Sequence, residues 1–186
     1  VFIQISLLNN VYIKKIKYKL NKAMKINLAI LAGGFGSRLK EITKKKPKPL
    51  IDINGRPFIK YILLYLIINN INQIYILTRY KKLLFKKKLN ISFSNIKIKC
   101  ISEKKPMGTG GALFNLKKFK TDFLILNGDS FPLFNIPKFL KLKKNKILLV
   151  KNKTYKSNNQ LNNLELNKQK VILKKKSIYM NGGVYY

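Results

Sequence analysis

The sequence predicts an α/β fold with a doubly wound, mostly parallel sheet and a small antiparallel extension. Short apolar runs alternate with segments of helical period from residue 26 to residue 151, which is the pattern of consecutive β-α-β units. A cluster of glycines at residues 33–36 follows the first apolar run, at the strand end where open parallel sheets bind ligands. Beyond residue 151 the alternation weakens, so we expect the antiparallel extension there.

The expected strands are short apolar runs bounded by charged or turn-forming residues. In the parallel part they are expected at 26–32, 73–78, 96–101, 122–126 and 146–151, and in the extension around 161–166, 170–174 and 182–186. The expected helices repeat apolar residues at helical spacing, over 57–70, 80–89, 109–119 and 136–143. Pro57 stands in the first turn of the first helix, where a proline costs no hydrogen bond.

The chain has 186 residues, 46% of them hydrophobic, which fits one domain with a sizeable core. We expect residues 24–186 to form this domain and residues 1–23 to be an N-terminal arm or an upstream extension, with Met24 as the natural start. The chain stops at Tyr186 within an expected strand. We therefore expect the domain to be truncated at its C-terminus.

The net charge is extreme, with 40 Lys and Arg residues against 6 Asp and Glu residues. Such a charge can indicate a nucleic-acid or other polyanion partner. However, only Arg38, Arg56 and Arg79 are arginines, whereas nucleic-acid binders more often cluster arginine with aromatic residues. Lysine is abundant throughout, and Trp and His are absent. We therefore favour a compositional drift toward AT-rich codons with a solvated lysine surface, and expect no specific nucleic-acid partner.

The single cysteine, Cys100, excludes an internal disulfide and suits a reducing cytoplasm. Because the chain has no histidine and one cysteine, a zinc site of the usual kind is implausible, and a metal would depend on the few carboxylates. No apolar run reaches the roughly 20 residues that a membrane-spanning helix needs. We expect a cytoplasmic protein without a membrane partner.

The glycine cluster and the segment that follows it predict a phosphate site. Glycine lets backbone N–H groups approach an anion closely, and Arg38 adds a planar fork suited to phosphate. In Pro47-Lys48-Pro49-Leu50 the two prolines stiffen the backbone that carries the lysine. The dinucleotide fingerprint G-x-G-x-x-G fails at Leu39, and no Walker A loop is present.

This chain resembles the sugar-1-phosphate nucleotidyltransferases, whose signature matches Leu-Ala-Gly-Gly-Phe-Gly-Ser-Arg-Leu at residues 31–39 and Pro-Lys-Pro-Leu at residues 47–50. Further matches lie at residues 106–112, 126–130 and 181–185. The combination most resembles the guanylyltransferases that act on D-glycero-D-manno-heptose 1-phosphate or mannose 1-phosphate. The resemblance implies a Rossmann-like fold and transfer of GMP from GTP to a sugar 1-phosphate, with release of pyrophosphate.

The resemblance also implies roles for individual residues. The nucleotide-binding residues would be Leu31, Ala32, Gly33, Gly34, Gly36, Glu103 and Gly108. The catalytic residues would be Arg38, which holds the β- and γ-phosphates, and Lys48, which neutralises the reacting phosphates. Asp129 would ligate Mg²⁺, the expected cofactor. The sugar-binding residues would be Asn127, Lys176, Asn181 and Gly182.

Both acids of the expected site also have a plain structural interpretation. Glu103 can accept from the N–H donors of guanine, whereas a uracil or thymine carbonyl would find no donor there, but Glu103 can equally be a solvated partner of Lys104 or Lys105. Asp129 can be a metal ligand, since Mg²⁺ binds through one or two carboxylates together with substrate phosphates. It can equally be a turn residue after Gly128.

Some segments depart from the family pattern and keep other functions open. In Leu173-Lys174-Lys175-Lys176, Lys176 is available as the lysine of the usual Glu-Lys pair, but the Glu is replaced. Residues 157–160 replace an Arg-Tyr-Gly-like segment, and a second metal-binding Asp is expected beyond residue 186. The alternatives are a thymidylyl- or uridylyltransferase acting on glucose 1-phosphate, a non-catalytic nucleotide-binding domain of the same fold, and a polyanion-binding protein. The activity of the truncated chain and its self-association into a homo-oligomer are left open.

Overall fold

The computed structural model describes most of the chain between residues 26 and 186. The described residues are 26–34, 36, 39–71, 73–79, 81–89, 97–103, 108–141, 146–151, 164–167, 170–173 and 179–186. The arm expected at 1–23, the expected start at Met24, Arg38 and Lys176 lie outside them.

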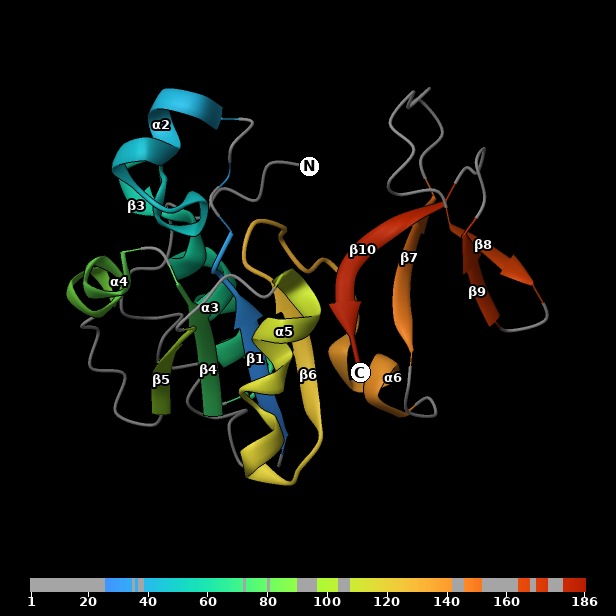
Figure 1. The fold of residues 1–186 in the computed structure, drawn as a ribbon. Helices are drawn as coiled ribbons and strands as arrows, with labels where there is room; N and C mark the ends of the chain where they lie inside the picture. Colours follow the sequence, from blue (N-terminus) through green and yellow to red (C-terminus); the bar gives the residue numbers. More distant parts are fainter. Residues whose placement is uncertain are drawn as a thin grey trace, which may run out of the picture.

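A parallel sheet forms the centre of the molecule (Figure 1). Its strands are β1 (Asn27–Leu31), β4 (Gln73–Thr78), β5 (Lys97–Ser102) and β6 (Phe123–Asn127). They lie in the order β5-β4-β1-β6, and each neighbouring pair is parallel. All four coincide with predicted strands to within one or two residues. β1, β4 and β6 are apolar runs with a buried centre, as expected for a sheet covered on both faces, whereas Lys97 and Lys99 of the edge strand β5 are exposed.

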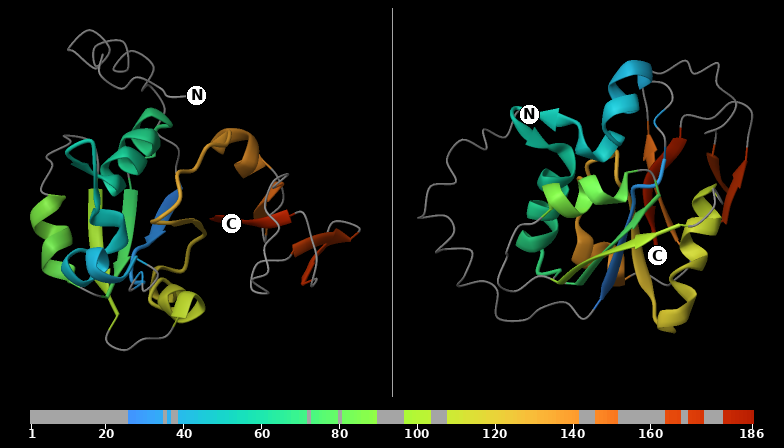
Figure 2. Two further views of the ribbon diagram at one scale, coloured as in Figure 1. Left: turned by 90° about the horizontal axis from the view of Figure 1, so that it is seen from above. Right: turned by 60° about the vertical axis from the view of Figure 1, so that its left-hand side comes forward.

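Helices cover both faces of this sheet (Figures 1 and 2). They are α3 (Phe58–Ile68), α4 (Lys82–Lys88), α5 (Gly108–Phe114) and α6 (Ile136–Lys141). The doubly wound α/β architecture predicted from the sequence is therefore confirmed. Within the predicted helix 109–119, α5 ends at Phe114 and a 3-10 turn, η4 (Lys117–Phe119), follows.

Alternate side chains of β1 pack into two different hydrophobic clusters, as the period of a strand requires. Leu28 and Ile30 pack with Ile59 and Leu63 of α3 on one face. Ala29 packs on the other face, in a cluster with Ala112 of α5 and with Tyr75 and Leu77 of β4. Each large aliphatic side chain buried in this way contributes about 1.5–3 kcal/mol, so β1 is fixed firmly below the loop that follows it.

The antiparallel extension consists of β7 (Ile147–Lys151), β8 (Leu164–Asn167), β9 (Lys170–Leu173) and β10 (Tyr179–Tyr185). Eight of the described strands form one sheet in the order β5-β4-β1-β6-β10-β8-β9, with β7 also paired to β10. β10 is antiparallel to both β6 and β7. The predicted fifth strand at 146–151 therefore exists, but β10 separates it from β6.

Four short elements between β1 and α3 were not predicted. Helix α2 (Lys40–Lys45) is followed by the 3-10 turn η3 (Lys48–Leu50). A small hairpin then pairs β2 (Asp52–Ile53) with β3 (Arg56–Pro57). These elements carry the chain across the carboxyl ends of the parallel strands.

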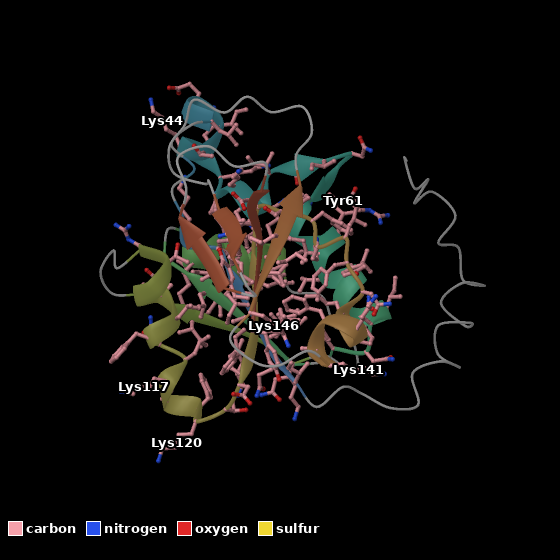
Figure 3. The ribbon with its side chains drawn as sticks, turned by 90° about the vertical axis from the view of Figure 1, so that its right-hand side faces the viewer. Lys44, Tyr61, Lys117, Lys120, Lys141 and Lys146 are labelled. Carbon is pink, nitrogen blue, oxygen red and sulfur yellow. The ribbon has the colours of Figure 1, made fainter. Side chains whose placement is uncertain are left out.

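The lysines are spread around the molecule. Figure 3 shows Lys44 beside α2, Lys117 and Lys120 at the opposite end of the molecule, and Lys141 on a further side. Such a distribution fits a solvated lysine surface better than one basic patch. Within the described part of the chain, none of the helices has the length and apolarity needed to span a lipid bilayer.

Candidate functional site

Two adjoining pockets open at the carboxyl ends of the parallel strands. The first, of about 270 Å³, is lined by Leu31, Ala32, Gly34, Gly36, Leu39, Lys48, Pro49 and Asp129. The second, of about 320 Å³, is lined by Leu31, Gly33, Gly34, Arg79, Glu103, Gly108, Thr109, Ala112, Asn127 and Asp129. Both share Leu31, Gly34 and Asp129, so they form one continuous site at the edge where open α/β sheets bind ligands.

The glycine loop after β1 is held in shape by helix α2. Gly36 has a φ of +66°, a left-handed conformation that favours glycine. Its carbonyl accepts hydrogen bonds from the backbone N–H of Leu39 at 2.9 Å and from the hydroxyl of Thr43 at 3.0 Å. Thr43 is only 4% exposed, so the loop rests on a buried polar contact that fixes where its backbone points.

Lys48 faces the first pocket from the rigid turn η3. Pro49 and Leu50 are buried beneath it, which anchors the backbone of the turn in the core. The ammonium of Lys48 lies 2.7 Å from the Oδ2 atom of Asp129, and both side chains are 40% exposed. The structure thus brings together two predicted site residues that are 81 positions apart in the chain.

Asp129 lies two residues beyond the end of β6, at a place where two backbone segments come close together. The N–H of Gly128 donates to the carbonyl of Leu31 at 2.9 Å. A Cβ atom at Gly128 would lie 2.8 Å from that same carbonyl oxygen, so glycine is required for the approach. The approach sets Asp129 beside the glycine loop, where its carboxylate lines both pockets.

Glu103 and Arg79 line the second pocket from neighbouring strands. Glu103 follows β5, and its N–H donates to the carbonyl of Thr78 at the end of β4 at 2.9 Å. Its carboxylate lies against the glycine loop, because a Cβ atom at Gly33 would be 3.0 Å from the Oε1 atom. Gly108, with a φ of +66°, starts α5 on the other side of this pocket.

The predicted sugar-binding residues lie on β6 and β10. Asn127 lines the second pocket and lies against Gly183, where a Cβ atom would be 2.8 Å from its Nδ2 atom. Asn181 uses both ends of its amide within β10: Nδ2 donates to the Tyr185 hydroxyl at 2.6 Å, and Oδ1 accepts from the Gly183 N–H at 2.8 Å. Gly182 packs against Leu148 and Val150 of β7. Asn127 is thus at the pocket, whereas Asn181 and Gly182 shape the strand beside it.

Sequence reasoning missed Arg79 and Thr43. Arg79 is the first residue after the predicted strand 73–78, so strand-end position could have found it. Thr43 had no such signal, because its contact with Gly36 depends on a short helix that the sequence did not predict.

A covalent nucleophile is not evident among the described residues. Cys100 is the free cysteine, and it lies within β5 rather than at the strand end. Burial raises the pKa of its thiol, which keeps it from forming the reactive thiolate. In the part of the chain that the structure describes, no three Cys, Asp or Glu side chains gather into a metal site. Among the described residues, Asp129 is the carboxylate that lines both pockets.

Comparison with known proteins places this arrangement in a family. Residues 28–160 match the family described as Nucleotidyl transferase. D-glycero-alpha-D-manno-heptose 1-phosphate guanylyltransferase from Campylobacter jejuni is 43% identical over 121 residues, which cover 64% of this chain and 54% of that protein. Mannose-1-phosphate guanylyltransferase from Mycobacterium tuberculosis is 31% identical over 107 residues, which cover 56% of this chain and 30% of that protein.

The fold agrees with this sequence likeness. The crystal structure of HddC from Yersinia pseudotuberculosis complexed with GMP-PN matches with a TM-score of 0.68 at 26% identity, over 86% of this chain and 75% of that one. The chain spans about half the length of the heptose-1-phosphate guanylyltransferases that it matches. The family match covers more than half of the chain and includes both pockets up to Asp129. The chain therefore belongs to the nucleotidyl transferase family.

Proposed function

We propose that the protein transfers GMP from GTP to a sugar 1-phosphate, either D-glycero-D-manno-heptose 1-phosphate or mannose 1-phosphate, giving an NDP-sugar and pyrophosphate. The observation that carries the proposal is the pair of joined pockets, which share Asp129 and place Lys48 in one and Glu103 in the other. One pocket offers a cation for phosphates, and the other offers an acceptor for a base. The likeness to guanylyltransferases supports the same choice.

In this reaction an oxygen of the sugar 1-phosphate attacks the α-phosphorus of GTP, and the bond to pyrophosphate breaks. The step needs two polyanions to be aligned and their growing charge to be neutralised. The position of Lys48 in the turn η3, at the lining of the first pocket, supports this role. Its ion pair with Asp129 is 40% exposed on both sides, and such a pair is worth less than about 1 kcal/mol. Lys48 can therefore exchange the carboxylate for phosphate oxygens at little cost.

Asp129 fits the role of a Mg²⁺ ligand by its chemistry and its place. It offers hard carboxylate oxygens that line both pockets, and Mg²⁺ binds in other proteins through one or two carboxylates together with substrate phosphates. When bound, the ion would supply positive charge next to the reacting phosphates. Arg38, by its place in the family signature, would hold the β- and γ-phosphates.

Glu103 supports the choice of guanine. Its carboxylate lies against Gly33, and it can accept hydrogen bonds from two neighbouring N–H groups of guanine. A carbonyl group of uracil or thymine would find no hydrogen-bond donor there, because the Glu103 carboxylate only accepts. Asn127, beside Gly183, supports a sugar contact at the β6 end of the second pocket, and the proposal extends to Lys176, Asn181 and Gly182.

A pyrophosphate-release assay on the full-length protein tests the proposal. GTP, UTP and dTTP are each paired with mannose 1-phosphate, D-glycero-D-manno-heptose 1-phosphate and glucose 1-phosphate, with and without Mg²⁺. We expect release with GTP and a manno-type sugar 1-phosphate, and only with Mg²⁺. Release with UTP or dTTP and glucose 1-phosphate would favour the rival transferase. Release from no pair would overturn the enzymatic assignment.

The variant Glu103→Gln tests, in the same assay, whether Glu103 determines the preference for guanine. The amide presents an N–H₂ group where guanine also donates, so we expect the preference for GTP over UTP to fall at least about tenfold. Glu41→Gln is the matched control, because Glu41 is an exposed acid paired with Lys44 outside both pockets. An unchanged GTP preference in Glu103→Gln would contradict the role of Glu103.

A further inference from the structure

Arg79 is the charged residue at the second pocket that the proposed function does not use. It lines the pocket together with Glu103 and Gly108. It is also one of three arginines, with Arg38 and Arg56, among the 40 basic residues of the chain. Arginine differs from lysine because its guanidinium is a planar fork that can donate two parallel hydrogen bonds.

The register of the sheet sets Arg79 next to Glu103. β4 and β5 are parallel, and their last residues, Thr78 and Ser102, are paired. Arg79 and Glu103 therefore follow directly after the paired ends of two neighbouring strands. Gly33 lies against both of them: a Cβ atom there would be 3.0 Å from the Oε1 atom of Glu103 and 3.5 Å from the Cβ atom of Arg79. Arg79, which carries a donor fork, and Glu103, which carries a pair of acceptor oxygens, therefore lie side by side in the lining of the pocket, next to the glycine loop.

This juxtaposition matches the polar edge of one base in particular. Guanine presents two acceptors, N7 and O6, to one side, and its N1–H and N2–H₂ donors follow next to O6. Adenine presents a donor at the corresponding exocyclic position, and pyrimidines have no N7. Building on the proposed GTP site, we infer that Arg79 is a specificity-determining residue that donates to O6 and N7 of guanine while Glu103 accepts from N1 and N2.

Arg79 and Glu103 would each contact different atoms of guanine, so GTP analogues that lack one set of atoms can test the two residues separately. 7-Deaza-GTP lacks the N7 acceptor and keeps the edge that faces Glu103, whereas ITP lacks the N2 amine and keeps the edge that faces Arg79. Equilibrium binding of GTP, 7-deaza-GTP, ITP and UTP is measured for the protein and for Arg79→Met, Arg79→Lys and Glu103→Gln. Arg56→Met is the matched control, because Arg56 lies in the β2–β3 hairpin outside both pockets.

We expect the unmodified protein to bind 7-deaza-GTP about tenfold more weakly than GTP, the usual scale of a bidentate arginine–guanine contact. Arg79→Met should bind both equally, at the weaker level, and should still prefer GTP over ITP. Arg79→Lys keeps the charge without the fork, so it should bind GTP better than Arg79→Met but should not distinguish 7-deaza-GTP. Arg56→Met should behave as the unmodified protein, and thermal melting confirms that each variant is folded.

Several results would overturn the inference. One is equal binding of GTP and 7-deaza-GTP by the unmodified protein, and another is discrimination that survives in Arg79→Met. A third is an Arg79→Met protein that loses only the preference for GTP over ITP, because Arg79 would then act by holding Glu103. If the unmodified protein binds no triphosphate, or binds UTP as tightly as GTP, the proposed function itself fails, and the inference fails with it.

Discussion

Gly36 and Gly34 stand two residues apart in the loop after β1, but their surroundings differ. Gly36 has a φ of +66°, and a Cβ atom there would lie 2.8 Å from the Cγ2 atom of Thr43. Gly34 has nothing within 4 Å of the corresponding position. One glycine is therefore needed by the backbone of the loop, and the other leaves open space where both pockets meet.

Replacing each of these glycines by alanine should separate the two roles. Gly36→Ala should lower the free energy of unfolding by at least about 1–2 kcal/mol, because a left-handed backbone is costly for an L-residue and the new methyl group meets Thr43. Gly34→Ala, as its control, should stay within about 0.5 kcal/mol of the parent protein. Urea denaturation measures both, and equal stability of the two variants would contradict this account of the loop.

Thr43 supports the same loop through its hydroxyl. Thr43→Val keeps the shape but removes one of the two donors to the Gly36 carbonyl, so we expect a loss of about 0.5–1.5 kcal/mol in the free energy of unfolding, the usual worth of one hydrogen bond. The Michaelis constant for GTP should rise more than the turnover number falls, because the loop is misplaced rather than the reacting groups. Thr43→Ser keeps the hydroxyl, so its free energy of unfolding and its Michaelis constant for GTP should stay close to those of the parent protein. A Thr43→Ser protein as impaired as Thr43→Val would exclude a role for the hydrogen bond.

We expect Lys48 to act on phosphates rather than to stabilise the fold. Lys48→Met should lower the rate of pyrophosphate release by about 100-fold or more, the usual effect of removing one group that stabilises developing charge. Its free energy of unfolding should change by less than about 1 kcal/mol, because the ion pair with Asp129 is partly exposed. Lys45→Met, an exposed lysine of α2, is the control. A turnover rate close to that of the control would remove Lys48 from the catalytic groups.

At the scale of elements, helix α2 connects the glycine loop to the lysine turn and is held at its C-terminal end by Lys81. The ammonium of Lys81 donates to the carbonyls of Lys44 at 2.5 Å and of Lys45 at 2.7 Å. These carbonyls have no partner within a helix that ends at Lys45. A lysine directly before α4 thus satisfies the last turn of the helix that carries Thr43.

Lys81→Met should loosen α2 without unfolding the sheet. Losing about 1 kcal/mol of hydrogen bonding should speed amide hydrogen exchange in Lys40–Lys45 about fivefold, while exchange in β1 and β4 stays unchanged. Lys87→Met, an exposed lysine of α4, should leave the exchange of α2 as it is. Equal exchange of α2 in both variants would show that the helix does not depend on this contact.

The predicted elements were those with a repeating pattern of their own. The strands of the parallel sheet and α3 are long enough for apolar periodicity to show, and the structure confirms them. The β2–β3 hairpin turns at Asn54-Gly55, whose φ angles of 49° and 74° suit a tight hairpin turn, but its two-residue strands give no alternation from which it could be predicted. The position of β10 between β6 and β7 depends on pairing between distant segments, which leaves no local pattern.

The candidate site was predicted in part for related reasons. Gly33, Lys48, Glu103 and Asp129 stand in motifs or at strand ends, and the structure places all of them at the pockets. Their mutual contacts, such as Lys48 with Asp129 across 81 positions, follow only once the sheet brings the strand ends together. The strand-end position of Arg79 was its one signal, because one more cation among 40 basic residues does not stand out by composition.

At the scale of the whole molecule, the net charge of +34 opposes the compact state through self-repulsion. Salt screens exposed charges over about 10 Å at 0.1 M and less at higher concentration. We therefore expect the melting temperature to rise as the NaCl concentration increases from about 20 to about 300 mM. Sucrose at matched osmolality is the control, and a melting temperature that stays flat or falls with salt would contradict the account of a solvated lysine surface.

The central claim, a nucleotide site that selects guanine, is tested most directly by calorimetric titration of this chain with GTP and with UTP in the presence of Mg²⁺. The account predicts saturable binding of one GTP per chain, at least about tenfold tighter than UTP, and weaker binding in Lys48→Met than in Lys45→Met. Binding of neither triphosphate, or equal binding of both with no effect of Lys48, would contradict it.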